Sequence, residues 1–360
     1  MTRLMVSVGE PSGDLIAGLM VEELRALRPD LEVTGVAGQR LTRAGITPIA
    51  NVTELSVMGL FEVIGSLGRI KRVLKRLISA LDQEVDLLVV VDFSGFNIRL
   101  ARAAKARDIP VVFYVSPQVW AWRHKRAAEI SKLAKEVLCL LPFEPDVYRA
   151  VGGNASFVGH PLAVSANREL ETAGHWLLLP GSRQAEIERL LPVMVAVARE
   201  LRSRDANAKF RLGAAPGWDA ERLSTVAKVD LSNIEVVDGL EVGAQGAKAA
   251  LVSSGTATLQ LGCRSIPMVV IYKVNPFTHW LLRRIVKGVD RIALPNIVLG
   301  RDVVPEFIQK LPPIEIADAL EVASLGEQVP ALSDLREVMS SENASRAAAI
   351  KVESWLPTLG

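Results

Sequence analysis

The chain has 360 residues, of which 49% are hydrophobic and 23% charged, a composition that excludes a disordered protein and suits two domains. Its 42 basic and 40 acidic residues leave a net charge of +2, which excludes the overall basic excess of a nucleic-acid-binding protein. Neither the two cysteines nor the four histidines show metal-ligand spacing, so we expect no metal and no disulfide framework.

The N-terminal apolar run, residues 4–8, is too short for the core of a signal peptide and stops at Gly9. No uninterrupted apolar stretch reaches the roughly 18 residues that a membrane-spanning helix needs. We therefore expect a chain that stays in the cytoplasm and does not cross a membrane.

Apolar runs recur along the chain, and most are followed by Gly, Pro, Ser or Asp, which favour turns and helix starts. In the first half we expect strands at residues 4–8, 32–36, 87–91, 111–115, 137–141 and 156–158. In the second half we expect them at residues 176–179, 209–212, 234–237, 250–252, 268–272 and 291–294. Runs that are apolar throughout indicate strands buried on both faces, so the prediction is an α/β protein with doubly wound parallel sheets.

The polar stretch 165–174 separates the two series of strands and is the predicted domain boundary. We expect an N-terminal Rossmann-like domain over residues 1–165 and a second one over 175–333. The remaining residues, 334–360, are helical in character and are expected to pack across both domains.

The first strand leads into the loop 9–14, Gly-Glu-Pro-Ser-Gly-Asp. Ligands of open α/β sheets gather at the carboxyl ends of strands, and a helix start offers free N–H groups to an anion. Four side chains or backbone positions of this loop are candidate contacts for a sugar or another acceptor: Glu10, Ser12, Gly13 and Asp14. The alternative is an ordinary turn in which Ser12 or Asp14 caps the helix.

The segment 66–80 contains five cations and no acid, and its apolar residues recur at helical spacing. Such a helix fits the surface of an anionic membrane, and the candidate contacts are Arg69, Ile70, Arg72, Val73, Leu74, Lys75 and Leu77. The alternative is a helix whose apolar stripe faces the core and whose basic face is solvated. Just upstream, the apolar stretch 55–61 includes Met58, which could cover an acyl chain or fill the core.

Asp92 directly follows the apolar run 87–91. A carboxylate at the carboxyl end of a strand can serve as a general base that removes a proton from a sugar hydroxyl. It can equally be the cap of a helix that begins near Ser94, and the pattern does not separate the two.

The run 176–179 leads into Pro180, Gly181, Ser182 and Arg183, and then into a helix-like stretch. A cation at the positive end of a helix is unfavourable unless an anion is shared there, and a diphosphate would resolve the conflict. The alternative is a solvated arginine. A second loop of this kind, with Ser254, Gly255 and Thr256, follows the run 250–252, but alone it is weaker than a Walker motif.

Taken together, the motifs resemble the lipid-A-disaccharide synthases, family 19 of the glycosyltransferases. The matching segments run in family order over nearly the whole chain: 9–14, 35–38, 56–59, 114–122, 140–144, 157–161, 179–183, 254–257 and 294–297. Each segment is weak by itself, whereas the ordered set is specific.

The resemblance implies a GT-B fold, in which two Rossmann-like domains face a cleft, and an inverting enzyme that needs no metal or cofactor. It implies transfer from UDP-2,3-diacylglucosamine to the 6-hydroxyl of 2,3-diacylglucosamine 1-phosphate (lipid X), as a step of lipid A biosynthesis. It further implies a peripheral location on the anionic inner membrane, no nucleic-acid partner, and a possible homodimer.

Carried over residue by residue, the resemblance makes Asp92 the base and places Arg183 at the UDP phosphates. It also places Glu10, Ser12, Ser254, Thr256 and Asn296 at site positions. The chain departs from the family twice: Gly95 stands where a second Asp is common, and Gln260 where a Glu is common. Gln260 is expected to contact the nucleotide more weakly than a carboxylate would.

Two other interpretations stay open from the sequence. One is a different GT-B enzyme that uses a UDP-sugar, such as an N-acetylglucosaminyltransferase or a 2-epimerase. The other is a catalytically silent protein that binds a nucleotide-sugar or a lipid, which the loss of the carboxylate at Gln260 favours.

Overall fold

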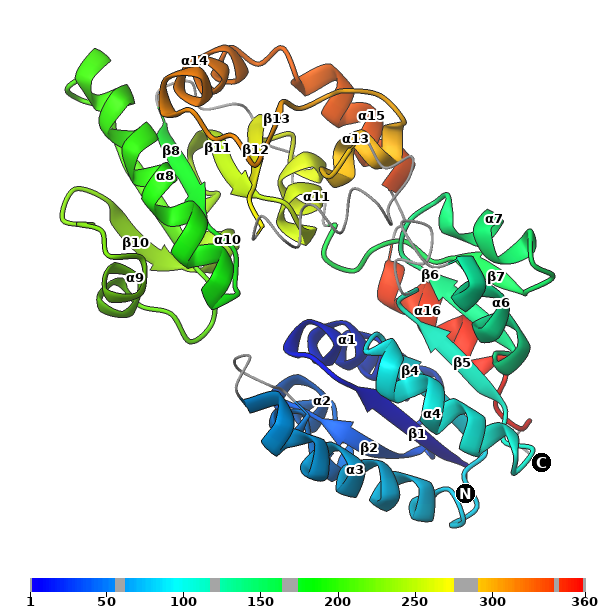
Figure 1. Ribbon diagram of the computed structural model, residues 1–360. Helices are drawn as coiled ribbons and strands as arrows, with labels where there is room; N and C mark the ends of the chain where they lie inside the picture. The colour runs from blue at the N-terminus through cyan, green and yellow to red at the C-terminus, as the bar shows by residue number, and fades with distance from the viewer. Residues whose placement is uncertain are drawn as a thin grey trace. The chain divides into compact units, whose positions relative to one another are not determined.

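The computed structural model describes residues 2–55, 62–116, 124–163, 174–274, 291–339 and 343–358. The chain forms two units, one made of Met1–Leu162 with Ser341–Gly360 and the other of Ala163–Ser340. Each unit contains one parallel sheet between helices (Figure 1). The α/β class with doubly wound parallel sheets is thereby confirmed.

The sheet of the first unit has seven parallel strands in the order β3-β2-β1-β4-β5-β6-β7. They are β1 (Arg3–Val8), β2 (Glu32–Ala37), β3 (Thr47–Asn51), β4 (Leu87–Val91), β5 (Val111–Tyr114), β6 (Glu136–Cys139) and β7 (Ala155–Phe157). The order reverses direction between β1 and β4, which is the topological switch point of a doubly wound sheet.

Helices cover both faces of this sheet. They are α1 (Pro11–Leu27), α2 (Gln39–Arg43), α3 (Glu62–Ala80), α4 (Ser94–Lys105), α6 (His124–Leu133), α7 (Glu144–Arg149) and α16 (Ala344–Glu353). Crossovers between parallel strands are right-handed, so α1 and α2, which lead toward β3, lie on one face. The crossover helices α3, α4, α6 and α7 lead toward β7 and lie on the other.

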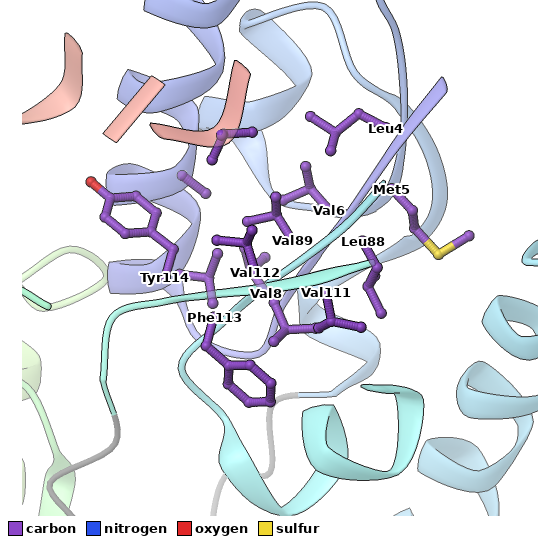
Figure 2. Packing of buried hydrophobic residues seen from close by; sticks show 14 of the residues in the cluster. Leu4, Met5, Val6, Val8, Leu88, Val89, Val111, Val112, Phe113 and Tyr114 are labelled. Carbon is purple, nitrogen blue, oxygen red and sulfur yellow. The ribbon is translucent and has the colours of Figure 1, made fainter. Parts of the chain in front are cut away.

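The core of the first unit is made by strand side chains that are buried on both sides of the sheet. Every residue of β4 is buried, and Figure 2 shows Val89 beside Val6 and Val112, and Leu88 beside Met5 and Val111. β-branched and aromatic residues favour strands, and burial on both faces explains why these runs carry no polar alternation.

The sheet of the second unit has six parallel strands in the order β10-β9-β8-β11-β12-β13. They are β8 (His175–Leu179), β9 (Phe210–Ala214), β10 (Glu235–Asp238), β11 (Ala247–Ser253), β12 (Met268–Tyr272) and β13 (Glu306–Ile308). The helices are α8 (Gln184–Arg204), α9 (Ala220–Ala227), α10 (Gly239–Gly243), α11 (Thr256–Cys263), α13 (Leu294–Leu299), α14 (Pro313–Ser324) and α15 (Val329–Met339). Here the order reverses between β8 and β11.

One strand expectation is wrong, and two strands, β3 and β13, were not expected. Residues 291–294 are not a strand: Leu294 begins α13, and β13 takes the edge position instead. The strand β3 was not foreseen, because it is a half-exposed edge strand that carries Pro48 and no apolar run. Edge strands tolerate proline and exposure, so they leave a weak pattern in the sequence.

The end of the chain completes the first unit, since α16 packs on α1 while α15 belongs to the second unit. The buried Arg28 donates to the carbonyl oxygen of Pro357 at 3.2 Å, and the Trp355 indole N–H donates to Glu136 at 2.8 Å. The expected tail 334–360 is thus divided between the two units in the structure.

Candidate functional site

Two of the loops predicted to carry chemistry lie side by side at the switch point of the first sheet. β1 and β4 pair in parallel, with Val8 opposite Val91, so Gly9 and Asp92 leave the same edge of the sheet. This is the place where open α/β sheets bind ligands.

Asp92 lies in an unusual backbone conformation. Its φ is 50° and that of Phe93 is 44°, so two consecutive residues are left-handed, which L-residues adopt at a cost. The turn is supported from the neighbouring loop, because a Cβ at Gly9 would overlap the Phe93 ring. Only glycine at position 9 lets the ring close over the end of β1.

Asn97 holds the turn from beneath. This fully buried side chain accepts a hydrogen bond from the Ser7 hydroxyl at 2.7 Å, and its amide N–H₂ donates to the carbonyl oxygen of Asp92 at 2.8 Å and to that of Val91 at 3.2 Å. The Asp92 side chain is half-buried, and within the described part of the chain its carboxylate has no hydrogen-bond or ion-pair partner. The backbone that carries Asp92 is therefore held in place, while its carboxylate remains available to a ligand.

The residues of the loop 9–14 divide into two groups. Glu10 and Ser12 lie at the start of α1, Ser12 exposed, and Gly13 packs against the end of β4. Asp14 turns inward: its buried carboxylate accepts from the backbone N–H groups of Gly38 at 2.7 Å and Arg40 at 2.9 Å. These bonds give Asp14 a structural role between α1 and α2.

The position of Gly95 faces open space, since a Cβ there would have no atom within 4 Å. An aspartate would fit without a clash, so packing does not explain the glycine. Nearby, the Arg126 guanidinium donates to the Ser94 hydroxyl at 3.0 Å and ties α6 to the start of α4.

The two loops of the second unit also meet at a switch point. β8 and β11 pair with Leu179 opposite Val252, which brings Gly181 next to the end of β11. Gly181 has a φ of 102°, and a Cβ on it would overlap the Glu186 carboxylate and approach the Ser253 hydroxyl to 3.1 Å. The backbone of this loop can be approached closely by a ligand because position 181 has no side chain.

Arg183 stands at the start of α8, with 72% of its side chain exposed and its guanidinium 3.9 Å from Glu186. The preceding carbonyl, that of Ser182, accepts a hydrogen bond of 3.1 Å from the Trp218 indole. Arg222 stacks on this indole at 4.2 Å from the ring centre. The start of the long helix α8 and an exposed guanidinium in the same loop form a suitable binding site for a diphosphate.

The loop after β11 supplies the neighbouring positions. The Ser254 hydroxyl donates to the carbonyl oxygen of Ile292 at 2.8 Å, and the exposed Thr256 begins α11 after Gly255. Gln260 is half-buried one turn further along the same helix. The structure thus gathers Gly181–Arg183 and Ser254–Gln260 at one edge of the second sheet.

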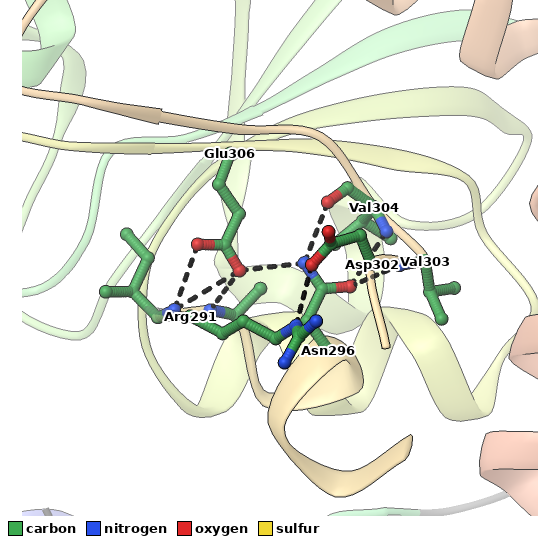
Figure 3. Close-up of polar contacts among 8 residues, drawn as sticks. Arg291, Asn296, Asp302, Val303, Val304 and Glu306 are labelled. Atoms are coloured by element: carbon green, nitrogen blue, oxygen red, sulfur yellow. Dashed lines mark hydrogen bonds and ion pairs between the residues drawn. The ribbon is translucent and has the colours of Figure 1, made fainter. Parts of the chain in front are cut away.

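Asn296 is buried and fully engaged with its own unit (Figure 3). Its amide donates to Val304 and Glu306, both at 2.8 Å, and its oxygen accepts from the N–H groups of Val303 and Val304. Glu306 in turn accepts from the backbone N–H groups of Ile292 and Ala293. Asn296 therefore shapes the loops around α13, and any effect on a nucleotide passes through them.

The expectation that Val73 and Leu77 contact a membrane is wrong. Both are fully buried in the core of the first unit, and Ile70 and Leu74 pack against that core in part. The apolar stripe of α3 covers the sheet, as the alternative predicted. Packing on the sheet removes the apolar side chains of the stripe from water, which is favourable. Arg69, Arg72 and Lys75 are exposed.

Met58 lies outside the described residues. In the described ranges no group of three His, Cys, Asp or Glu side chains could hold a metal ion, and no helix is long and apolar enough to cross a bilayer. His160 is buried, its Nδ1 accepts from the Leu162 N–H at 3.1 Å, and burial lowers its pKa to about 4.

Sequence reasoning missed Asn97 and Trp218 as parts of the site. Asn97 carried one signal, an amide near the start of an otherwise good helix, where asparagine is a poor helix former. Trp218 carried none, since its contact with Ser182 joins residues 36 positions apart.

Comparison with known proteins gives one consistent family. The model of the lipid-A-disaccharide synthetase family matches residues 4–346. The lipid-A-disaccharide synthase of Myxococcus xanthus is 37% identical over 99% of this chain and 98% of its own length. That of Anaeromyxobacter dehalogenans is 38% identical over 94% of this chain and 93% of its own.

Solved structures share the fold at low identity. A glycotransferase of kitacinnamycin superposes with a TM-score of 0.69 at 18% identity, covering 99% of both chains. The UDP-GlcNAc 2-epimerase of Methanocaldococcus jannaschii, solved with UDP-GlcNAc and UDP, gives 0.64 at 12% identity and covers 98% of this chain and all of its own. Both likenesses concern the fold alone.

Proposed function

The chain belongs to the lipid-A-disaccharide synthase family of glycosyltransferases, and from that premise we propose that it joins UDP-2,3-diacylglucosamine to lipid X. The products are the β(1→6) disaccharide 1-phosphate and UDP. The observation that carries the proposal is the pair of switch-point sites, one with an available carboxylate and one with an anion-receiving loop. Because a UDP-sugar has an acidic diphosphate and its acceptor has an alcohol to be deprotonated, the two sites match the two halves of the reaction.

In the proposed reaction the 6-hydroxyl oxygen of lipid X attacks the anomeric carbon of the donor sugar. Asp92 takes the hydroxyl proton as the new C–O bond forms, and the bond between the anomeric carbon and the diphosphate breaks. The left-handed turn and the hydrogen bond from Asn97 fix the backbone that presents the carboxylate, which limits the reorganisation needed when the proton moves.

The leaving UDP gains negative charge on its diphosphate. We assign its stabilisation to the Arg183 guanidinium and to the N–H groups at the starts of α8 and α11. Ser182, Ser254 and Thr256 supply hydroxyls beside them, and Gln260 lies at the position proposed to face the ribose. Glu10 and Ser12 are proposed to contact the acceptor sugar.

Both substrates carry acyl chains, so we propose that the enzyme works at the cytoplasmic surface of the anionic inner membrane. The exposed cations of α3 — Arg69, Arg72 and Lys75 — are suited to that contact. A homodimer is proposed from the family resemblance alone, and light scattering of the purified protein tests it.

The decisive experiment incubates the purified protein with UDP-2,3-diacylglucosamine and lipid X and identifies the lipid product by mass. The expected product is the tetra-acyl disaccharide 1-phosphate, formed in step with UDP. Activity only with unacylated UDP-N-acetylglucosamine would favour a different UDP-sugar enzyme. Binding of the donor without UDP release would favour the silent binding protein that Gln260 leaves open.

A further inference from the structure

The positive charge of the chain is concentrated in three helices. The helices α3, α4 and α6 contain eleven Lys and Arg residues and two acids, Glu62 and Glu129, which gives them a net charge of +9. The whole chain has a net charge of +2, so everything outside these helices sums to −7. A segregation of this size predicts a strongly polarised electrostatic field around a nearly neutral protein.

The fold places these three helices in one layer. All three are crossovers that lead from β3 toward β7, so they cover the same face of the first sheet. α3 packs on α4, and α4 packs on α6 (Figure 1). The opposite face carries α1, α2 and α16, whose five Lys and Arg residues and four acids nearly cancel and leave a net charge of +1.

Internal pairing does not neutralise the layer. Arg102 pairs with Glu129 across α4 and α6, Arg76 pairs with Glu54, and Arg126 is engaged with Ser94. Six further exposed cations have no acidic partner in the described part of the chain: Lys71, Arg72, Lys75, Arg99, Lys125 and Lys132. They extend across all three helices and not along α3 alone.

We propose that the basic layer, the outer face of α3, α4 and α6, is a docking surface that lies flat on an anionic lipid bilayer. The inference rests on the proposed function, which supplies the reason for a lipid partner, and it enlarges the contact from one helix to three. Val73 and Leu77 are buried against the sheet, so along this part of α3 the outer face presents cations to the membrane. When the protein lies flat on this layer, the carboxyl edge of the sheet, which carries Asp92, is close to the membrane surface but is not covered by it.

The test separates the new part of the surface from α3. The full chain is sedimented with vesicles of phosphatidylcholine alone or mixed with phosphatidylglycerol. The test variant combines Arg99→Glu, Lys125→Glu and Lys132→Glu, which changes α4 and α6 and leaves α3 intact. The matched control combines Arg43→Glu, Arg199→Glu and Lys209→Glu, three exposed cations outside the basic layer that give the same change of net charge.

We expect the test variant to lose about tenfold or more in partitioning to anionic vesicles, since several surface cations contribute together. The control should lose less than about threefold, because charges far from the contact are screened. Equal losses in the two variants, no loss in the test variant, or equal binding of the wild type to neutral vesicles would each overturn the proposal. The proposal would also be overturned if duplex DNA displaced the wild type from anionic vesicles at a phosphate concentration lower than that of the vesicles.

Turnover with detergent-dispersed substrates keeps the two proposals apart. The test variant should retain wild-type turnover there, and matching thermal unfolding shows that it is folded. If the wild type has no turnover but binds anionic vesicles through the layer, the proposed reaction fails and the docking surface stands. If the wild type turns over its substrates but does not bind anionic vesicles, the docking surface fails and the proposed reaction stands.

Discussion

The proposed chemistry depends most on a single side chain, that of Asp92. Asp92→Asn keeps the shape of the residue and the hydrogen bond from Asn97 to its carbonyl, but an amide cannot accept the proton. We expect turnover to fall by roughly 10² to 10⁴, the usual worth of a general base, with an unchanged unfolding temperature. Steady-state release of UDP measures the effect. Turnover within a few-fold of the wild type would remove Asp92 from the role of base.

Asn97 is predicted to act through Asp92. Asn97→Ala removes this partner from the buried Ser7 hydroxyl and from three carbonyl oxygens, which should cost about 1–3 kcal/mol of stability. Because the left-handed turn loses its support, kcat should fall about 10- to 100-fold while KM changes less. Ser7→Ala is the control: it removes only one of these bonds and should lower stability by about 1 kcal/mol with near-normal kcat.

Trp218 is predicted to position the diphosphate loop. Trp218→Phe keeps a ring beside Arg222 but removes the hydrogen bond to the Ser182 carbonyl, worth about 0.5–1.5 kcal/mol. The KM for the UDP-sugar should rise about 2- to 10-fold, with a smaller change in kcat. Trp355→Phe, which loses the equivalent N–H bond to Glu136 in the first unit, should leave KM unchanged. The same rise of KM in both variants would contradict the assignment.

Among the secondary-structure elements, α16 shows how a distant segment becomes part of a unit. Its Ala348, Ala349 and Val352 are fully buried. Glu136 of β6 forms an ion pair with Lys351 of α16 and accepts a hydrogen bond from Trp355, which follows the helix. Burial acts to raise the pKa of Glu136, but the bonds from Ser156, Trp355 and Lys351 outweigh it and hold the pKa below its ordinary value of 4.5.

This arrangement predicts an acid-sensitive docking of α16. Because the pKa of Glu136 is lowered by folding, its stabilisation is present above pH 4.5 and is lost as the pH falls through the lower, folded value. Glu136→Gln should therefore be less stable than the wild type at pH 7, and the difference should shrink on acidification toward about pH 3. Thermal unfolding at a series of pH values measures this. A difference that is constant with pH would rule out the charge of Glu136 as the cause.

Considered as a whole molecule, the chain combines a net charge of +2 with a basic layer of +9. If that layer holds the protein on lipid by charge alone, binding to anionic vesicles should fall steeply as salt increases, since the screening length shrinks from about 10 Å at 0.1 M to about 3 Å at 1 M. Sedimentation at increasing sodium chloride measures this. Binding that survives about 1 M salt would indicate inserted apolar groups instead.

The sequence by itself determined the fold class, the division into two parallel-sheet units and the loops in which the site lies. These features are local: apolar runs, the Gly, Ser and Asp residues that follow them, and the ordered motifs that identify the family. The loops 9–14, 92–97, 181–183 and 254–256 all begin at the carboxyl ends of central strands, as the pattern predicted.

Only the tertiary structure decided which of the predicted residues are available to a ligand. Asp14 and Asn296 have polar side chains at motif positions, but distant backbone N–H groups engage them, and Val73 and Leu77 lie against the sheet and not against a membrane. Likewise α16 joined the first unit, and Asn97 and Trp218 joined the site. Except at Asn296, whose partners are seven to ten positions away, the deciding contact connects residues far apart in sequence. Such contacts are fixed by strand order and packing, which local periodicity does not encode.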